Sequence, residues 1–322
     1  MIEEINESVY VSPYTKNSSR KIEVETVDPV YMAVKTTYTS EDFLAEAYIS
    51  KDKYIQMIRR LNRKKNIILQ GAPGVGKTFL AKRLAYSLIG KKDDDRVSMI
   101  QFHQNYAYED FVMGFRPNET GGFNLEKGLF YTFCQKAMDD IENPYFFIID
   151  EINRGNLSKI FGELLLLIEA DKRDKKFAIE TTYSKERFYI PKNLYIIGLM
   201  NTADRSLAIM DYALRRRFSF IEIDPAFGGN FEKYMKQFEH TKLSRVIQVI
   251  MQINEAITQD ESLGRGFRIG HSYFSDLNTG NDEELYEIIE CEIVPLLEEY
   301  WGENYEKFST YVKALRGALQ YA

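Results

Sequence analysis

The sequence predicts an α/β fold, in which a mainly parallel sheet is covered by helices on both faces and is followed by a smaller helical domain. Three observations predict it. Short apolar strands alternate with helical patterns between residues 41 and 224. A glycine-rich segment joins the first of these strands to the helix after it. Beyond Gly229 the strand signal fades, and helical patterns continue to the end of the chain. Continuous apolar strands are typical of parallel sheets buried on both faces.

The expected elements follow one another along the chain. A helical pattern begins behind Thr39 and Ser40, and a second one lies near residues 55–61. Strands are expected at 66–70, 97–102, 145–149, 194–200 and 218–223. The helices between them are expected at 78–90, 128–140, 158–170 and 206–216. The second domain should contain helices at 230–239, 242–258, 283–299 and 304–320.

Composition indicates a soluble globular protein. The chain has 322 residues, of which 44% are hydrophobic and 28% are charged. This length and hydrophobic content are enough to form a core in each of two domains. The net charge of −6 excludes a global positive field for nucleic acid. Two cysteines, Cys134 and Cys291, are too few for a disulfide scaffold. No apolar run approaches the ~18 residues that a membrane span needs, so we expect a cytoplasmic location.

A phosphate-binding loop is predicted by the segment GAPGVGKT, which fits the pattern G-x-x-x-x-G-K-[ST] between a buried strand and a helix. Its glycines allow backbone N–H groups to surround phosphates, and the helix N-terminus adds positive potential. Lys77 is expected to reach the outer phosphates and the Thr78 hydroxyl to bind Mg²⁺. A plain glycine-rich turn is the alternative. The residues expected to hold the nucleotide are Gly71, Ala72, Pro73, Gly74, Val75, Gly76, Lys77 and Thr78.

Two adjacent carboxylates end the strand expected at 145–149. Asp150 and Glu151 follow the apolar residues YFFII. Adjacent carboxylates are costly at a buried strand edge unless a cation or a reaction uses them. We expect Asp150 to hold Mg²⁺ and Glu151 to polarise the attacking water. The alternative is a strand-end pair that caps the next helix.

The strand expected at 194–200 runs directly into Asn201. A neutral amide at this point could contact both the terminal phosphate and the water. The residues Asn201 to Asp204 also resemble the N/T-K-x-D box that reads guanine in small GTPases, although the lysine is missing. The position beside the carboxylate strand favours phosphate sensing over base reading.

Three consecutive arginines, Arg215, Arg216 and Arg217, end the helix expected at 206–216. Successive residues differ by about 100° around a helix, so the three guanidinium groups cannot all serve one phosphate. A cation at a helix C-terminus is favourable in itself, which accounts for Arg215. We expect Arg216 and Arg217 to act as arginine fingers that reach the nucleotide of a neighbouring subunit.

Four segments together resemble the AAA+ module of the McrB family, the motor subunits of modified-cytosine-dependent restriction. They are GAPGVGKT, IIDEINRGNLSKIFGELL, GLMNTADRSLAIMDYALRRRFSF and GRGFRIGHSYF, in this order. The resemblance covers most of residues 41–322. It implies an AAA+ P-loop NTPase with an αβα sandwich and a helical lid, and hydrolysis of GTP with Mg²⁺. It also implies a ring, commonly a hexamer, and a McrC-type nuclease subunit that stimulates hydrolysis and cuts DNA.

The resemblance also assigns roles to single residues. Lys77 and Thr78 match Walker A, Asp150 and Glu151 match Walker B, and Asn201 matches the sensor-1 position. Asp204, which we count with the nucleotide-binding residues, Arg205 and Asp211 match family positions near the subunit interface. In the lid, Arg268 is the candidate for a second sensor over the phosphates. His271 is a weaker candidate, because a lone histidine beside aromatic residues is more often a hydrogen-bonded core residue.

We expect three parts: an N-terminal extension or remnant at 1–40, the AAA+ domain at 41–224 and the lid at 225–322. Family members carry a DNA-reading domain ahead of the motor, whereas about 40 residues precede it here. Nine acidic side chains oppose four basic ones in residues 1–50, so we expect DNA contact only through the assembled complex or a missing domain. The alternatives are an ATP-driven MoxR-like remodelling chaperone and a nucleotide-binding assembly form that does not read DNA.

Overall fold

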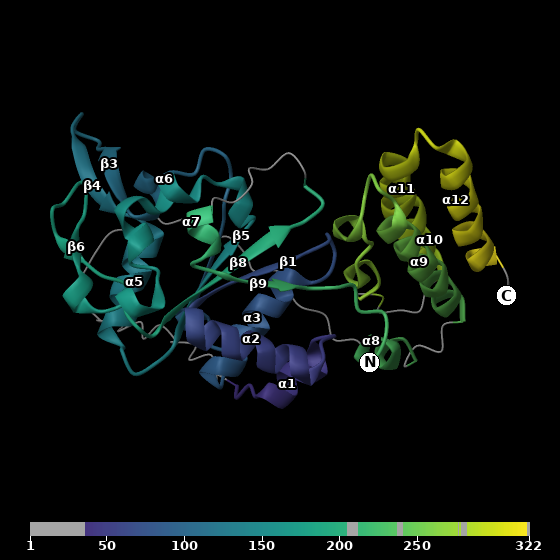
Figure 1. The fold of residues 1–322 in the computed structure, drawn as a ribbon, viewed down its shortest axis with the longest axis horizontal. Helices are drawn as coiled ribbons and strands as arrows, with labels where there is room; N and C mark the ends of the chain where they lie inside the picture. Colours follow the sequence, from purple (N-terminus) through teal and green to yellow (C-terminus); the bar gives the residue numbers. More distant parts are fainter. Residues whose placement is uncertain (1–35, 205–211, 237–240, 276, 278–281, 321–322) are drawn as a thin grey trace, which may run out of the picture. The chain divides into compact units, whose positions relative to one another are not determined.

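The central sheet of the computed structural model has five strands, all parallel, in the order β2-β5-β8-β1-β9 (Figure 1). The structure describes residues 36–204, 212–236, 241–275, 277 and 282–320. The parallel α/β architecture predicted from the sequence is confirmed, and every strand of this sheet lies within one residue of its expected bounds. The strands are β1 (Asn66–Gly71), β2 (Val97–Gln101), β5 (Tyr145–Asp150), β8 (Leu194–Asn201) and β9 (Ser219–Glu222).

Helices cover both faces of this sheet because successive residues of a buried strand point to opposite sides. Ile67 and Leu69 of β1 belong to one core, whereas Ile68 belongs to the other. The first core is completed by α1 (Ser40–Glu46), α2 (Lys51–Lys64) and α3 (Lys77–Ile89). The second is completed by α4 (Tyr108–Phe111), α5 (Leu129–Asp139) and α6 (Leu157–Phe161).

The sequence-based prediction was wrong at three places within this domain, one helix end and two hairpins. The helix expected at 158–170 ends at Phe161, because Gly162 has a left-handed φ of 51° and is followed by 3-10 turns. Two hairpins were missed, because the strands of one have only two residues each and exposed apolar residues obscure the alternation in the other. They are β3 (Met113–Pro117) with β4 (Phe123–Lys127), and β6 (Ile179–Glu180) with β7 (Arg187–Phe188).

Only α7 (Tyr212–Arg215) is described of the helix expected at 206–216, and residues 205–211 lie outside the described residues. The family positions Arg205 and Asp211 therefore also lie outside them. The N-terminal extension is described only from residue 36, where Thr37 forms a bridge with Lys91.

Five α-helices of the second domain pack around a separate apolar core that includes Val246, Ile250 and Leu315. The run expected at 283–299 is interrupted by a π-helical segment, Ile288–Ile293, between α10 and α11. We propose the domain boundary at Asp224, just after β9. No helix in the described parts of the chain is both long and apolar enough to cross a membrane. The helices are α8 (Asn230–Lys236), α9 (Thr241–Gln259), α10 (Asp282–Glu287), α11 (Val294–Trp301) and α12 (Tyr305–Gln320).

Candidate nucleotide-binding site

The strand register brings the predicted site residues to one edge of the sheet. Gly71 at the end of β1 pairs with Asn201 at the end of β8. Asp150 at the end of β5 pairs with Gln101 of β2. All these strands are parallel, so their carboxyl ends lie at the same edge, which is where ligands bind in open α/β sheets.

The phosphate loop leads from β1 into α3, whose N-cap residue Gly76 makes no side-chain capping hydrogen bond. The backbone N–H groups of the first turn of the helix therefore remain available to an anion. Gly74 and Gly76 both have a φ of 72°, a left-handed conformation that glycine adopts without steric strain. These features match the expected cradle for phosphates.

Lys77 is buried, and its hydrogen-bond partners among the described residues are carbonyl oxygens. Its Nζ donates to the carbonyl oxygens of Gly71 at 3.0 Å and Ala72 at 2.8 Å. Burial lowers the pKa of Lys77 to about 8, although the negative charges of Glu151 and Asp150 oppose the shift. An anionic ligand would relieve this desolvation, so Lys77 fits its predicted role at the outer phosphates.

The predicted Mg²⁺ residues fit a hard cation. Asp150 is half-buried, which raises the pKa of its carboxyl, and its Oδ1 accepts the N–H of Glu151 at 3.0 Å. Thr78 is exposed at the start of α3. In the described part of the chain, no group of three His, Cys, Asp or Glu residues could hold a metal. Carboxylate and hydroxyl oxygens suit Mg²⁺, which is usually bound through one or two carboxylates together with phosphate oxygens.

Glu151 is fixed by two side chains. It has a left-handed backbone, with φ 49° and ψ 43°, an uncommon state outside glycine. Asn201 Nδ2 donates to Glu151 Oε1 at 2.5 Å, and Arg154 Nε lies 3.2 Å from Oε2. Arg154 Nη2 also lies 3.1 Å from Asp204 Oδ2. The structure therefore joins three predicted residues, Glu151, Asn201 and Asp204, in one polar network.

Sequence reasoning missed Arg154 as the centre of this network. The signal was its spacing, three residues after Glu151, which places the two side chains together in the short 3-10 helix Ile152–Arg154. The partner Asp204 comes from a distant segment, so no local pattern could have revealed it.

The arginine triplet divides into two exposed residues and one buried residue. Arg216 is 67% exposed, with Nη2 3.3 Å from Glu169 Oε1. Arg217 is only 8% exposed, with Nη2 2.8 Å from the same oxygen. In this chain the ion pair directs the Arg217 side chain toward Glu169 and away from solvent, so the predicted role as a finger remains a proposal that Arg216 fits better. Arg215 is exposed and lies 5.8 Å from the ring of Phe220.

The lid contacts the phosphate loop through a segment that includes the 3-10 helix His271–Phe274. Ser272 N–H donates to the Gly74 carbonyl at 2.9 Å. A Cβ on Gly270 would lie 2.0 Å from the carbonyl carbon and oxygen of Gly74, so only glycine fits there. Thr202, next to Asn201, donates its hydroxyl to the Gly266 carbonyl at 3.3 Å. The strand edge, the loop and the lid are thereby joined by direct contacts.

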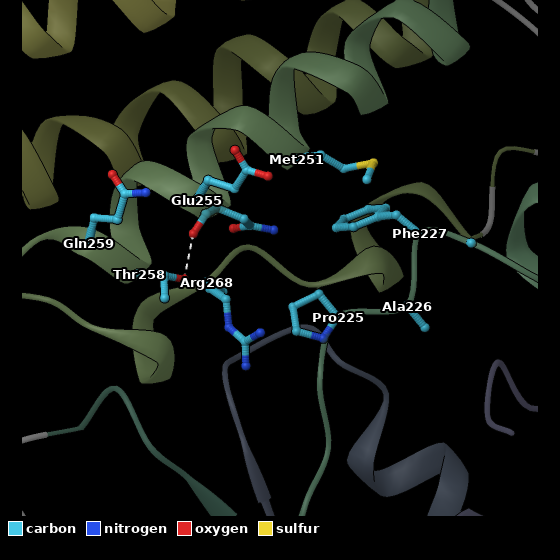
Figure 2. A pocket seen from close by; sticks show the side chains of 10 residues that line it. Pro225, Ala226, Phe227, Met251, Glu255, Thr258, Gln259 and Arg268 are labelled. Atoms are coloured by element: carbon cyan, nitrogen blue, oxygen red, sulfur yellow. Dashed lines mark hydrogen bonds between the residues drawn. The ribbon is translucent and has the colours of Figure 1, made fainter.

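Arg268, the predicted second sensor, pairs with a carboxylate and a carbonyl of this chain. Its Nη2 donates to Asp224 Oδ1 at 2.6 Å, and its Nε donates to the Arg265 carbonyl at 3.0 Å. It lines a pocket of about 590 Å³, which we call the hinge pocket. Figure 2 shows this pocket between the segment from Pro225 to Gly228 and α9 residues such as Met251.

A phosphate loop after a buried strand, carboxylates at a neighbouring strand end and a helical lid define a nucleotide-binding protein of the AAA class. The family described as "AAA domain (dynein-related subfamily)" matches residues 66–218. The family described as "McrB, alpha-helical lid domain" matches residues 245–309. The chain therefore contains an McrB-type AAA domain followed by an McrB lid domain.

Two curated relatives are components of restriction enzymes. The chain is 49% identical over 297 residues to the "Type IV methyl-directed restriction enzyme EcoKMcrB subunit" of Escherichia coli K12, an alignment that covers 89% of this chain. It is 26% identical over 218 residues to the "Type II restriction enzyme BsuMI component YdiS" of Bacillus subtilis 168, over 56% of this chain. The matched regions span 64% and 61% of these relatives. A Cytophaga hutchinsonii structure described as a candidate ATPase aligns over 67% of this chain and 68% of that one, at 14% identity and a TM-score of 0.39, too low to support any argument.

Proposed function

We propose that this chain is the GTP-hydrolysing motor of a modification-dependent DNA restriction system, stimulated by a McrC-type nuclease subunit to translocate DNA and license cleavage. The observation that carries the proposal is the joining of Glu151 and Asn201 beside a phosphate loop, in a chain with an McrB lid domain. The names of both curated relatives support the restriction context.

The residues of the chain divide the work of hydrolysis. Lys77 and the open N–H groups of α3 hold the outer phosphates. Thr78 and Asp150 would hold Mg²⁺, which when bound neutralises charge on the phosphates. Glu151 accepts a proton from the attacking water, and Asn201 orients Glu151 through the 2.5 Å hydrogen bond.

In this proposal the site is completed by a neighbouring subunit. Arg216 is exposed and carries a cation at the end of α7, so it is the side chain best able to reach a nucleotide on another protomer. The guanidinium would stabilise negative charge that develops in the transition state. A closed ring, hexameric in this proposal, gives every site such a neighbour.

Side-by-side hydrolysis of GTP and ATP, with and without a co-encoded nuclease subunit, tests the proposal. We expect faster turnover of GTP than of ATP and further stimulation by the partner. Lys77→Ala should abolish turnover in both cases, because the phosphates lose their cation. A preference for ATP with no response to the partner would favour a remodelling ATPase. Nucleotide-dependent assembly without turnover would favour an assembly form.

A further inference from the structure

A second pocket lies next to the phosphate loop, and we call it the loop-lid pocket. Its volume is about 300 Å³. Four segments line it: the end of α1 and the residues after it, the phosphate loop with the start of α3, the residues just after β9, and the lid. Because Val75 and Gly76 of the phosphate loop form one wall, this pocket is placed to hold the remainder of a nucleotide whose phosphates bind that loop.

The charged side chains of this pocket are carboxylates. Glu46 is already occupied, since Oε2 accepts from Arg83 at 2.5 Å and from Tyr38 at 3.0 Å, and Lys92 reaches Oε1 at 3.3 Å. Asp224 is different. Arg268 holds its Oδ1 at 2.6 Å, but among the described residues no hydrogen bond reaches Oδ2. The side chain of Asp224 is 55% exposed, so one carboxylate oxygen remains available to a ligand in the pocket.

His271 adds no positive charge to this pocket. Its Nδ1 accepts the Ala226 N–H at 3.1 Å, and its ring packs against Tyr48 and Phe231. Burial lowers the pKa of His271 to about 4, so the ring is neutral near pH 7. Among the described residues no Lys or Arg lines this pocket, so Asp224 offers a ligand an acceptor carboxylate whose described cationic partner, Arg268, lines the hinge pocket instead.

A carboxylate accepts hydrogen bonds and donates none when ionised. Guanine presents two adjacent donors, N1–H and the N2 amino group, whereas adenine presents an acceptor, N1, beside its single amino donor. An ionised carboxylate therefore matches guanine and repels the adenine N1. We infer that Asp224 reads the N1–H and N2 edge of guanine in the loop-lid pocket, with Arg268 as the residue that positions it. This inference rests on the proposed function, because it names the side chain that selects GTP.

Asp224→Asn tests the inference by reversing one hydrogen bond without changing the shape of the side chain. The amide oxygen can still accept from Arg268, and the NH₂ group replaces the free oxygen. Xanthine carries a C2 carbonyl where guanine carries the amino group, so the variant should favour xanthosine triphosphate. Equilibrium competition with the full-length chain and Mg²⁺ should show GTP affinity falling by about 10- to 100-fold, with xanthosine triphosphate gaining by a similar factor.

Asp171→Asn is the matched control, because Asp171 is 70% exposed and pairs with Lys172 outside the pocket. It should leave the order of nucleotide affinities unchanged. The unsubstituted chain provides a second test that does not depend on the folding of a variant. Inosine triphosphate lacks only the N2 amino group, so it should bind about 10-fold more weakly than GTP.

The outcomes separate this inference from the proposed function. A chain that prefers GTP but binds inosine triphosphate equally well overturns the role of Asp224 and leaves the GTPase proposal intact. A folded Asp224→Asn variant with an unchanged ratio of GTP to xanthosine triphosphate does the same. A chain that prefers ATP overturns the proposed GTPase itself.

Discussion

Two residues at this site are held in energetically unfavourable states. Lys77 is buried against carbonyl groups, and burial holds its pKa near 8. Glu151 keeps a left-handed backbone, which costs of order 1 kcal/mol for a residue other than glycine. Such strain persists because Asn201 and Arg154 fix the Glu151 side chain. The local cost is consistent with a site built to bind a charged substrate.

His271 should make the stability of the protein depend on pH. Burial lowers its pKa from 6.5 to about 4 in the folded state. Between these values the unfolded chain binds a proton that the folded chain excludes, so stability falls as pH decreases from 6.5 to 4. Compared with His271→Gln, the wild type should lose up to about 3 kcal/mol more of its free energy of unfolding across this window. Denaturant titrations at several pH values measure the difference.

The exposed His103 supplies the control for this measurement. His103→Gln should leave the pH dependence of unfolding close to that of the wild type. Parallel curves for the wild type and His271→Gln would show that His271 is not the group responsible.

The site residues that could be predicted from the sequence are polar residues that directly follow an apolar strand. Asp150, Glu151 and Asn201 each follow an apolar strand, so their meeting at one sheet edge could be expected. The burial of Arg217 could not be expected from the sequence. The three adjacent arginines have the same local sequence pattern. Arg217 is the buried one because it pairs with Glu169, which lies 48 residues earlier in the chain.

At the scale of elements, the central strands were the most predictable part of the chain. They are apolar on both faces and are bounded by turns, and these features depend on local sequence alone. The β3–β4 hairpin was missed because exposed residues such as Phe115 and Phe123 obscure the alternation of a half-buried strand. The helix expected at 158–170 ends after α6 because of one glycine, Gly162. A single glycine is compatible with a helical pattern, so the sequence did not reveal this end.

The contact between the lid and the phosphate loop should depend on Gly270. Its backbone dihedral angles, φ −78° and ψ 164°, are allowed for any residue. An alanine at this position would therefore be unfavourable only because its Cβ would clash with Gly74. Gly270→Ala should therefore push the lid segment away from the loop. We expect a loss of 1–3 kcal/mol in stability, as in other overpacked sites, together with weaker nucleotide binding. Thermal unfolding with and without nucleotide measures both effects.

Gly317→Ala is the control for this substitution, because a Cβ at Gly317 in α12 meets nothing within 4 Å. It should stabilise the helix by roughly 0.5–1 kcal/mol and leave nucleotide binding unchanged. Equal nucleotide affinities for Gly270→Ala and the wild type would show that the lid contact does not support the loop.

At the scale of the whole molecule, one protomer presents an incomplete site. Lys77, Asp150, Glu151 and Asn201 meet at the sheet edge, but among the described arginines of the triplet none reaches them in the same chain. Arg154 is near, yet it already pairs with Glu151 and Asp204. Under the proposed function, a second protomer supplies this cation, and the catalytic arrangement is then complete only between two chains.

Mixing two inactive variants tests whether Arg216 acts between subunits. Arg216→Ala should reduce hydrolysis by about 10³-fold or more, as for other arginine fingers, and Glu151→Gln should remove the general base. In a ring with equal amounts of both, about a quarter of the interfaces join an intact Glu151 to an intact Arg216 from the neighbour. Activity should therefore return to roughly a quarter of the wild-type rate. A mixture of Glu151→Gln with Lys77→Ala is the control. It should restore much less activity, because Glu151 and Lys77 are needed in the same chain. Recovery in this second mixture alone would refute the action of Arg216 between subunits.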